Sequence, residues 1–150
     1  MKLEGLAARL AEERLAVLGG FACDEGEAGM PPGTRTLVML GPLEPGFWPH
    51  IQAQPEWGGA DPVDRWSRRV IGEIACDLGA KALFPFGGPP YHPFQAWALR
   101  TGRAWQSPVR LLVHVDQGLM VSFRGALALR QAFDVPAAVP SVCEGCAAPC

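Results

Sequence analysis

Charge is scarce in this chain of 150 residues, and signals for export or membrane insertion are missing. Only 19% of the residues are Asp, Glu, Lys or Arg, and the formal net charge is -2. Nucleic-acid binders usually carry a basic face, so this composition argues against one. No uncharged stretch reaches the roughly 20 residues that span a bilayer, and Glu4, Glu12 and Glu13 interrupt the apolar pattern of the N-terminus. We therefore expect a cytoplasmic protein that uses no membrane.

Common catalytic signatures are also missing. The sequence has no G-x-S-x-G nucleophile elbow, no H-E-x-x-H zinc motif, no Rossmann glycine fingerprint and no P-loop. The sequence therefore does not indicate any of the enzyme or nucleotide-binding classes that these motifs define. Disorder is not expected either, because 49% of the residues are hydrophobic.

Glycine and proline are abundant, with 18 and 15 residues, and they divide the chain into short elements. Asp61 is a predicted N-cap and Pro62 a predicted first helical residue, while Gly79 ends the same helix. The order of elements predicts an α/β (α+β) domain over 1–134, with a single mixed, largely antiparallel sheet flanked by helices. A Pro-containing linker and a cysteine tail follow over 135–150. Apolar spacing predicts helices over 3–18, 47–51, 62–78 and 94–100, strands over 34–40 and 81–86, and a hairpin of 110–115 with 119–123.

Isolated cysteine and histidine side chains are expected to be structural. Cys23 and Cys76 stand alone in sequence and are predicted to be buried as small hydrophobic residues. His114 alternates with Leu112 on a predicted strand, which favours a packed or edge histidine over a ligand.

The last eight residues carry the strongest chemical signal, the spacing C-x2-C-x3-C formed by Cys143, Cys146 and Cys150. Thiolates at this spacing converge on zinc and on iron–sulfur clusters, and both usually take four protein ligands. A metal-free, frayed terminus is the alternative. A disulfide framework is less expected in the cytoplasm.

A second candidate site is the Gly/Pro-rich loop that follows the predicted strand 81–86. Ligands of open α/β sheets often bind at strand ends, although a rigid turn packed on the core explains the composition equally well. Arg124 is a candidate anion ligand at a strand end, and Trp105 follows a turn. The candidate cofactor-binding residues are Phe86, Gly87, Gly88, Tyr91, His92, Trp105 and Arg124.

Several segments resemble known families. TGRAWQSP (101–108), LLVH (111–114) and FRGAL (123–127) resemble a signature of epoxyqueuosine reductases. The helix that follows Asp61 and the predicted hairpin are similar to those of the CblC-type cobalamin-processing family. FPFGGPP (84–90), DRWSRR (64–69) and SFRGAL (122–127) most closely resemble small bacterial ferredoxin-like proteins. The resemblance covers most of the chain and is weakest before Leu37.

The resemblance implies a nitroreductase-related, corrinoid-reductase-like domain that leads into an iron–sulfur segment. It also implies a 4Fe-4S cluster on the tail, and a redox partner protein or a small-molecule cofactor such as cobalamin or flavin. Asp61 matches the proton-donating Asp of epoxyqueuosine reductases and is the one catalytic candidate that the resemblance implies. The Tyr-His that accompanies this Asp in the family is missing here. In relatives a further Cys-Pro continues the cysteine run, and we expect three thiolates alone to hold no stable monomeric cluster.

Three functions therefore remain open at the level of sequence. The first is a 4Fe-4S electron-transfer or reductase protein. The second is a cobalamin- or flavin-binding module without a functional cluster. The third is an interaction domain with structural zinc, completed by a ligand from a partner chain.

Overall fold

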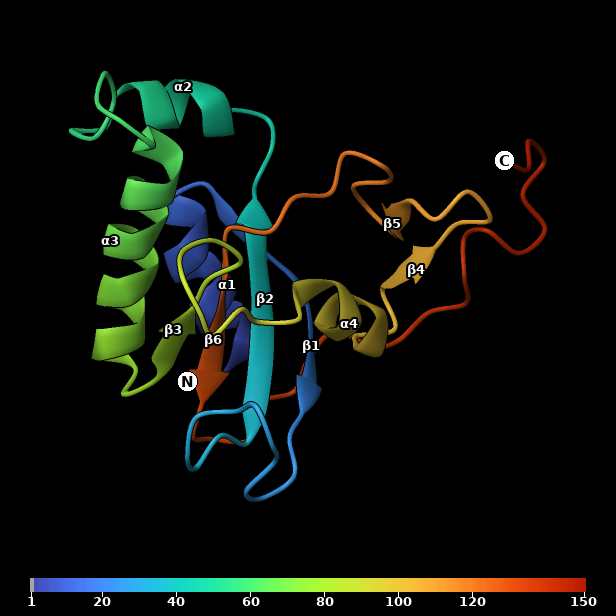
Figure 1. The fold of residues 1–150 in the computed structure, drawn as a ribbon, viewed down its shortest axis with the longest axis horizontal. Helices are drawn as coiled ribbons and strands as arrows, with labels where there is room; N and C mark the ends of the chain where they lie inside the picture. The colour runs from blue at the N-terminus through green and yellow to red at the C-terminus, as the bar shows by residue number, and fades with distance from the viewer. Residues whose placement is uncertain (1) are drawn as a thin grey trace.

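The structure is a computed structural model that describes residues 2–150, and its centre is an antiparallel sheet (Figure 1). Four strands pair in the order β1-β2-β6-β3, and a separate two-stranded hairpin joins β4 to β5. All pairings are antiparallel, which confirms an α/β fold with a largely antiparallel sheet. The prediction of a single sheet is wrong, because β4 and β5 pair apart from the other strands. The strands are β1 (Leu15–Ala22), β2 (Thr36–Pro42), β3 (Lys81–Leu83), β4 (Ala104–Gln106), β5 (Leu112–His114) and β6 (Gly125–Leu129).

Both faces of the sheet are buried, which explains why its central strands are almost entirely apolar. Successive side chains of a strand point to opposite faces, so each face receives every second residue. On β2, Val38 and Leu40 enter one core, while Leu37 and Met39 enter the other. On β6 the second face receives only alanines, Ala126 and Ala128.

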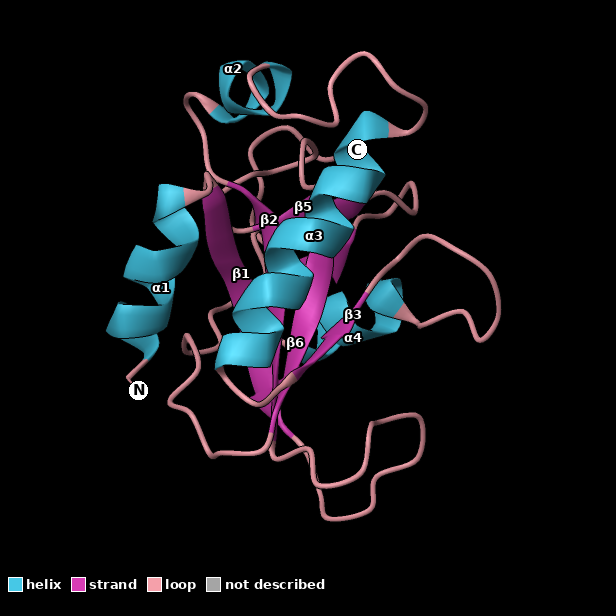
Figure 2. Ribbon diagram, turned by 90° about the vertical axis from the view of Figure 1, so that its left-hand side faces the viewer, coloured by secondary structure: helices cyan, strands magenta, loops and turns pink. Residues whose placement is uncertain are grey.

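Helices cover the sheet from both sides. Figure 2 shows α1 (Leu3–Glu12) and α3 (Pro62–Asp77) over one face, with α4 (Phe94–Arg100) behind the other. The short α2 (Phe47–Gln52) closes one end of the first core. No helix within residues 2–150 has the length and apolar character needed to cross a membrane.

The predicted helix 3–18 is wrong beyond Glu12. Arg14 has a φ of 54°, which ends the helix, and the chain continues as strand β1. Gly19 and Gly20, which look like helix stops, lie inside this strand. A Cβ on Gly19 would lie 2.8 Å from the Cβ of Thr101, and one on Gly20 would lie 2.8 Å from Val135 Cγ1. The glycine pair therefore permits close approach of other segments rather than ending a helix.

A β-bulge in β1 is stabilised by a buried histidine. Val17 pairs with Leu40 and Gly19 with Met39, so Leu18 is an extra residue in the strand. Nε2 of His114 lies 2.6 Å from the carbonyl oxygen of Leu18. Nδ1 of the same ring accepts the amide N–H of Asp116 at 3.1 Å, so the hydrogen sits on Nε2, which donates. The prediction of a packed His114 is confirmed.

The predicted hairpin has the wrong second strand. β5 pairs with β4, the strand that precedes it in sequence, and Trp105 lies opposite Val113. Residues 119–123 form no strand. Phe123 instead packs against Phe94 at the edge of the second core, whereas Leu119 and Met120 are exposed. The predicted strand 81–86 ends at Leu83, shortly before Pro85, whose nitrogen cannot donate to a ladder.

Helix α3 follows its sequence signals except at its cap. Pro62 begins the helix as predicted, and Gly79 with a φ of 62° ends it. Asp61 lies in the left-handed region with a φ of 44°, and its side chain makes no capping hydrogen bond. The capping prediction is therefore wrong. The predicted helices at 47–51 and 94–100 and the strand at 34–40 are confirmed within two residues at each end.

Candidate functional site

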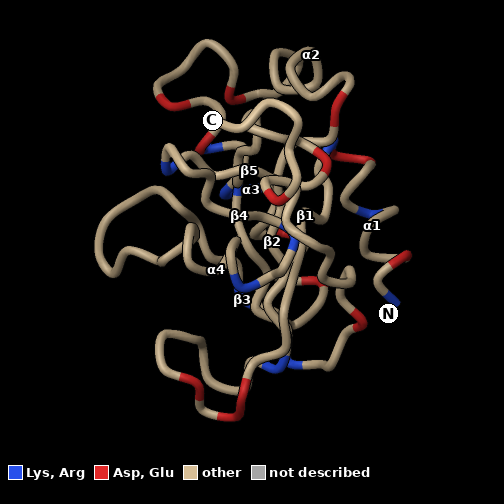
Figure 3. Tube along the Cα trace, turned by 90° about the vertical axis from the view of Figure 1, so that its right-hand side faces the viewer, with Lys and Arg blue, Asp and Glu red and all other residues tan. Residues whose placement is uncertain are grey.

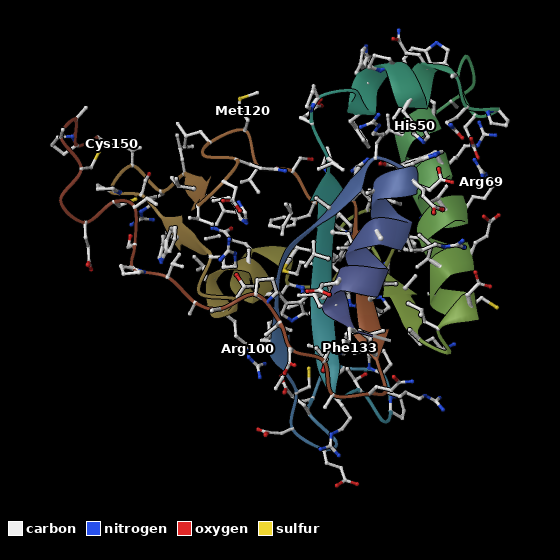
Figure 4. The ribbon with its side chains drawn as sticks, turned by 180° about the vertical axis from the view of Figure 1, so that it is seen from behind. His50, Arg69, Arg100, Met120, Phe133 and Cys150 are labelled. Atoms are coloured by element: carbon white, nitrogen blue, oxygen red, sulfur yellow. The ribbon has the colours of Figure 1, made fainter. Side chains whose placement is uncertain are left out.

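The three tail cysteines line one cavity, which we call the cysteine pocket. It has a volume of about 210 Å³. Cys143, Cys146 and Cys150 form one wall, together with Val142 and Pro149. The opposite wall comes from the β4–β5 hairpin and the segment after it, through Ser107, Pro108, Val113 and Leu119. Apart from Ser107, the residues around the thiols are apolar. Figure 4 shows Cys150 at the outer end of the molecule, far from α1 and α3.

Local hydrogen bonds shape both walls of the cysteine pocket. On the hairpin side, Ser107 donates its amide to the carbonyl of Leu111 at 2.8 Å, and its hydroxyl accepts the amide of Leu111 at 3.1 Å. On the tail side, the hydroxyl of Ser141 accepts the amide of Cys143 at 3.2 Å. The carbonyl of Ser141 accepts the amide of Glu144, also at 3.2 Å. This turn at Ser141 begins the cysteine run.

The thiols are free and accessible in this conformation. Cys143 is half-buried, whereas Cys146 and Cys150 are exposed. Within the part of the chain that the structure describes, no three His, Cys, Asp or Glu side chains are arranged to hold a single metal ion. The three thiols therefore line one apolar cavity, but they do not converge on a single point within it.

The other two cysteines do not line the cysteine pocket. Cys23 is buried in the core beneath α4, as predicted. Burial and the nearby carboxylate of Glu27 raise the pKa of its thiol, which favours the unreactive protonated form. Cys76 is exposed on α3, so the prediction of burial is wrong. Its helix buries Ile74 and Ala75, and the next position already turns towards solvent.

The predicted cofactor loop is held against α3 and β6. The guanidinium groups of Arg68 and Arg124 lie 5.4 and 5.5 Å from the ring centroid of Phe86. Arg124 also donates to the carboxylate of Asp64 at 3.0 Å. A Cβ on Gly87 would lie 2.7 Å from Nη2 of Arg68. The structure thus brings Phe86, Gly87 and Arg124 together as a packed cluster.

The remaining candidates lie apart from this cluster. Tyr91 is 76% exposed, and the ring of His92 stacks on Trp97 at a centroid distance of 5.6 Å. Gly88 has open space around it, and Asp61 is exposed at the start of α3. Trp105 belongs to β4 in the hairpin. Figure 3 shows the loop beside α4 without charged residues, in keeping with its sequence, and charges of both signs scattered elsewhere.

Two features of the cysteine pocket are not evident from the sequence. One is its exposed apolar surroundings, since Val109, Leu111, Leu119 and Met120 are all more than half exposed. The sequence places most of these residues in the predicted hairpin of 110–115 with 119–123. Arg110 has a positive φ of 65°, which changes the direction of the chain within this segment. Arginine is not a residue type that predicts a positive φ. The other is Arg103, which contacts both the hairpin and the linker.

Comparison with protein-family models, with curated proteins and with solved structures yields no match. The function must therefore be inferred from the residues and their geometry.

Proposed function

We propose that this chain is an electron-transfer protein, or the reductase component of one, that binds a 4Fe-4S cluster through Cys143, Cys146 and Cys150. The observation that carries the proposal is that these three thiols line one apolar cavity against the β4–β5 hairpin. The resemblance of the middle segments to ferredoxin-like and corrinoid-reductase-like proteins points the same way. We extend the proposal to a nitroreductase-related fold, a cytoplasmic location and a redox partner protein.

The three cysteine thiols are the type of ligand that iron–sulfur clusters take. Such clusters are held by cysteine thiolates, and an apolar shell around them limits water and tunes the reduction potential. The irons of a cluster sit at separate corners, so its ligands need not meet at one point. The lining of the cysteine pocket supplies three thiolates, and a fourth iron needs a ligand from outside that lining.

The residues of the chain have distinct parts in this scheme. The bound cluster supplies one-electron chemistry at its irons. Cys143, Cys146 and Cys150 would hold three of those irons. The apolar side chains of Val113, Leu119 and Val142 would lie beside them. Leu119 belongs to this lining and is more than half exposed, so an electron donor or acceptor would approach there.

Cysteine variants test the proposal against a matched control. The full chain is reconstituted without oxygen from ferrous iron, sulfide and a small thiol that serves as the outside ligand. Each of Cys143→Ser, Cys146→Ser and Cys150→Ser should lose most of the bound iron and the brown colour. Cys76→Ser removes an exposed thiol from α3 and should leave both unchanged.

Other outcomes would overturn the cluster assignment. Iron content that does not change in Cys143→Ser would show that the tail is not its site. A colourless protein with stoichiometric zinc would favour the structural zinc domain. Tight cobalamin binding by iron-free protein, with a changed cobalt absorption spectrum, would favour the cofactor-binding module instead.

A further inference from the structure

Arg103 joins the two segments that form the cysteine pocket. It immediately precedes β4, and its side chain is only 18% exposed. Nη1 donates to the carbonyl of Ala137 in the linker at 3.0 Å. Nη2 donates to the carboxylate of Asp116, just after β5, at 3.1 Å. One guanidinium group thus binds the linker and the hairpin at the same time.

The backbone around Arg103 reinforces this junction. The amide of Val115 donates to the carbonyl of Arg103 at 2.9 Å, and the amide of Val139 donates to the carbonyl of Gly102 at 3.0 Å. Gly102 has a φ of 68°, and a Cβ there would lie 2.5 Å from the Cβ of Ala138. The linker is therefore seated tightly on the turn between α4 and β4, a few residues before the cysteines.

We propose that Arg103 is the positioning residue of the cysteine pocket, because it fixes the linker to the hairpin and so holds the three thiols against Val113 and Leu119. This inference rests on the proposed function only where it concerns a cluster. Arg103 does not line the pocket and acts through the linker.

The planar guanidinium group suits this task better than an ammonium group. Its nitrogens donate in fixed directions, so two acceptors from different segments are held at a defined separation. A lysine offers a single nitrogen on a flexible stem and can keep one of the two contacts at a time. Arg103→Lys should therefore rescue only part of what Arg103→Gln loses.

Hydrogen exchange of the metal-free full chain tests the positioning role without any cluster. In Arg103→Gln, the amide of Val139, which donates to the carbonyl of Gly102, should exchange about tenfold faster or more, the scale set by losing a hydrogen bond from a charged group. Asp116→Asn, which neutralises an exposed side chain, weakens only the hairpin contact and should produce a smaller increase. The control Arg69→Gln breaks a partly buried ion pair on α3 and should not change exchange in the linker.

A reconstituted cluster provides the second measurement. The charge-neutral double variant Arg103→Gln/Asp116→Asn should bind iron but show a raised reduction potential, because greater exposure to water stabilises the more negative reduced cluster. Arg69→Gln should leave the potential unchanged. Unchanged linker exchange in folded Arg103→Gln would overturn the positioning role. Failure of every variant, and of the unchanged chain, to bind iron would overturn the cluster proposal alone.

Discussion

At the scale of single residues, glutamate–arginine pairs hold the loops of this protein to its helices. Nε of Arg69 donates to Oε1 of Glu56 at 2.6 Å, and Nη2 donates to Gln54 at 3.2 Å. Arg100 pairs with Glu27 and lies 4.1 Å from the ring centroid of Phe21. Figure 4 shows Arg69 and Arg100 on different elements. Each pair therefore fixes a separate surface loop.

The Glu56–Arg69 pair should make stability depend on pH. The hydrogen bond from Arg69 lowers the pKa of Glu56 below its ordinary value. Its stabilisation is thus complete above the unfolded-state pKa of about 4.3 and is lost as the pH falls through the folded-state pKa. Glu56→Gln should cost about 1 kcal/mol at pH 7, a value reduced for the partial exposure of Arg69.

Urea unfolding of the unchanged chain and of Glu56→Gln, at neutral pH and near pH 3, checks this prediction. The difference in unfolding free energy between them should be full at neutral pH and smaller near pH 3, because the lowered pKa of Glu56 makes the loss begin only below its ordinary value. Glu73→Gln is the matched control, because its carboxylate is exposed and 3.9 Å from Arg69. An equal cost of Glu56→Gln at both pH values would show that the effect is not electrostatic.

At the scale of elements, the sheet requires strand β2 to lie close to the bulge in β1 and to the segment before β6. A Cβ on Gly41 in β2 would lie 2.3 Å from both Leu18 Cδ1 and the carbonyl oxygen of Ser122. A backbone oxygen cannot rotate away as a side chain can. The bulge at Leu18 and the segment before β6 therefore both require a glycine at position 41.

Two glycine-to-alanine changes should have opposite effects. Gly41→Ala should lower the unfolding free energy by about 1–3 kcal/mol, the usual cost of overpacking a core. Gly72→Ala lies in α3 with open space around it, and should raise stability by about 0.5–1 kcal/mol through helix propensity. Chemical denaturation measures both. A neutral Gly41→Ala would contradict the tight packing described at the bulge.

Elements with an unambiguous local signal could be predicted from sequence. Helix α3 has a proline start, a glycine stop and one apolar stripe, and β2 is a short run of β-forming residues. Strand β1 could not, because Leu15 and Leu18 fit helical spacing and only pairing with β2 decides between the two states. The pairing of β5 with β4 could not be predicted either. The turn signal at Gly118 favours a partner that follows β5 in sequence, whereas β4 precedes it.

At the scale of the whole molecule, the C-terminal segment, which carries the three tail cysteines, lies on the side opposite α3 (Figure 1). The three-cysteine motif and its linker could be read from the sequence alone. The cysteine pocket could not, because its second wall comes from Pro108, Val113 and Leu119, far earlier in the chain. That wall depends on the β4–β5 pairing and on the contacts of Arg103, which are tertiary features.

The most direct test of the central claim is the iron and acid-labile sulfide content of the full chain, reconstituted and purified without oxygen in the presence of a small thiol. We expect iron and sulfide in equal amounts at about one cluster per chain, as the 4Fe-4S composition requires. Removal of the small thiol should make that cluster labile, since the cysteine pocket provides three thiolates. Protein that retains neither iron nor sulfide, or that holds zinc in their place, would contradict the account.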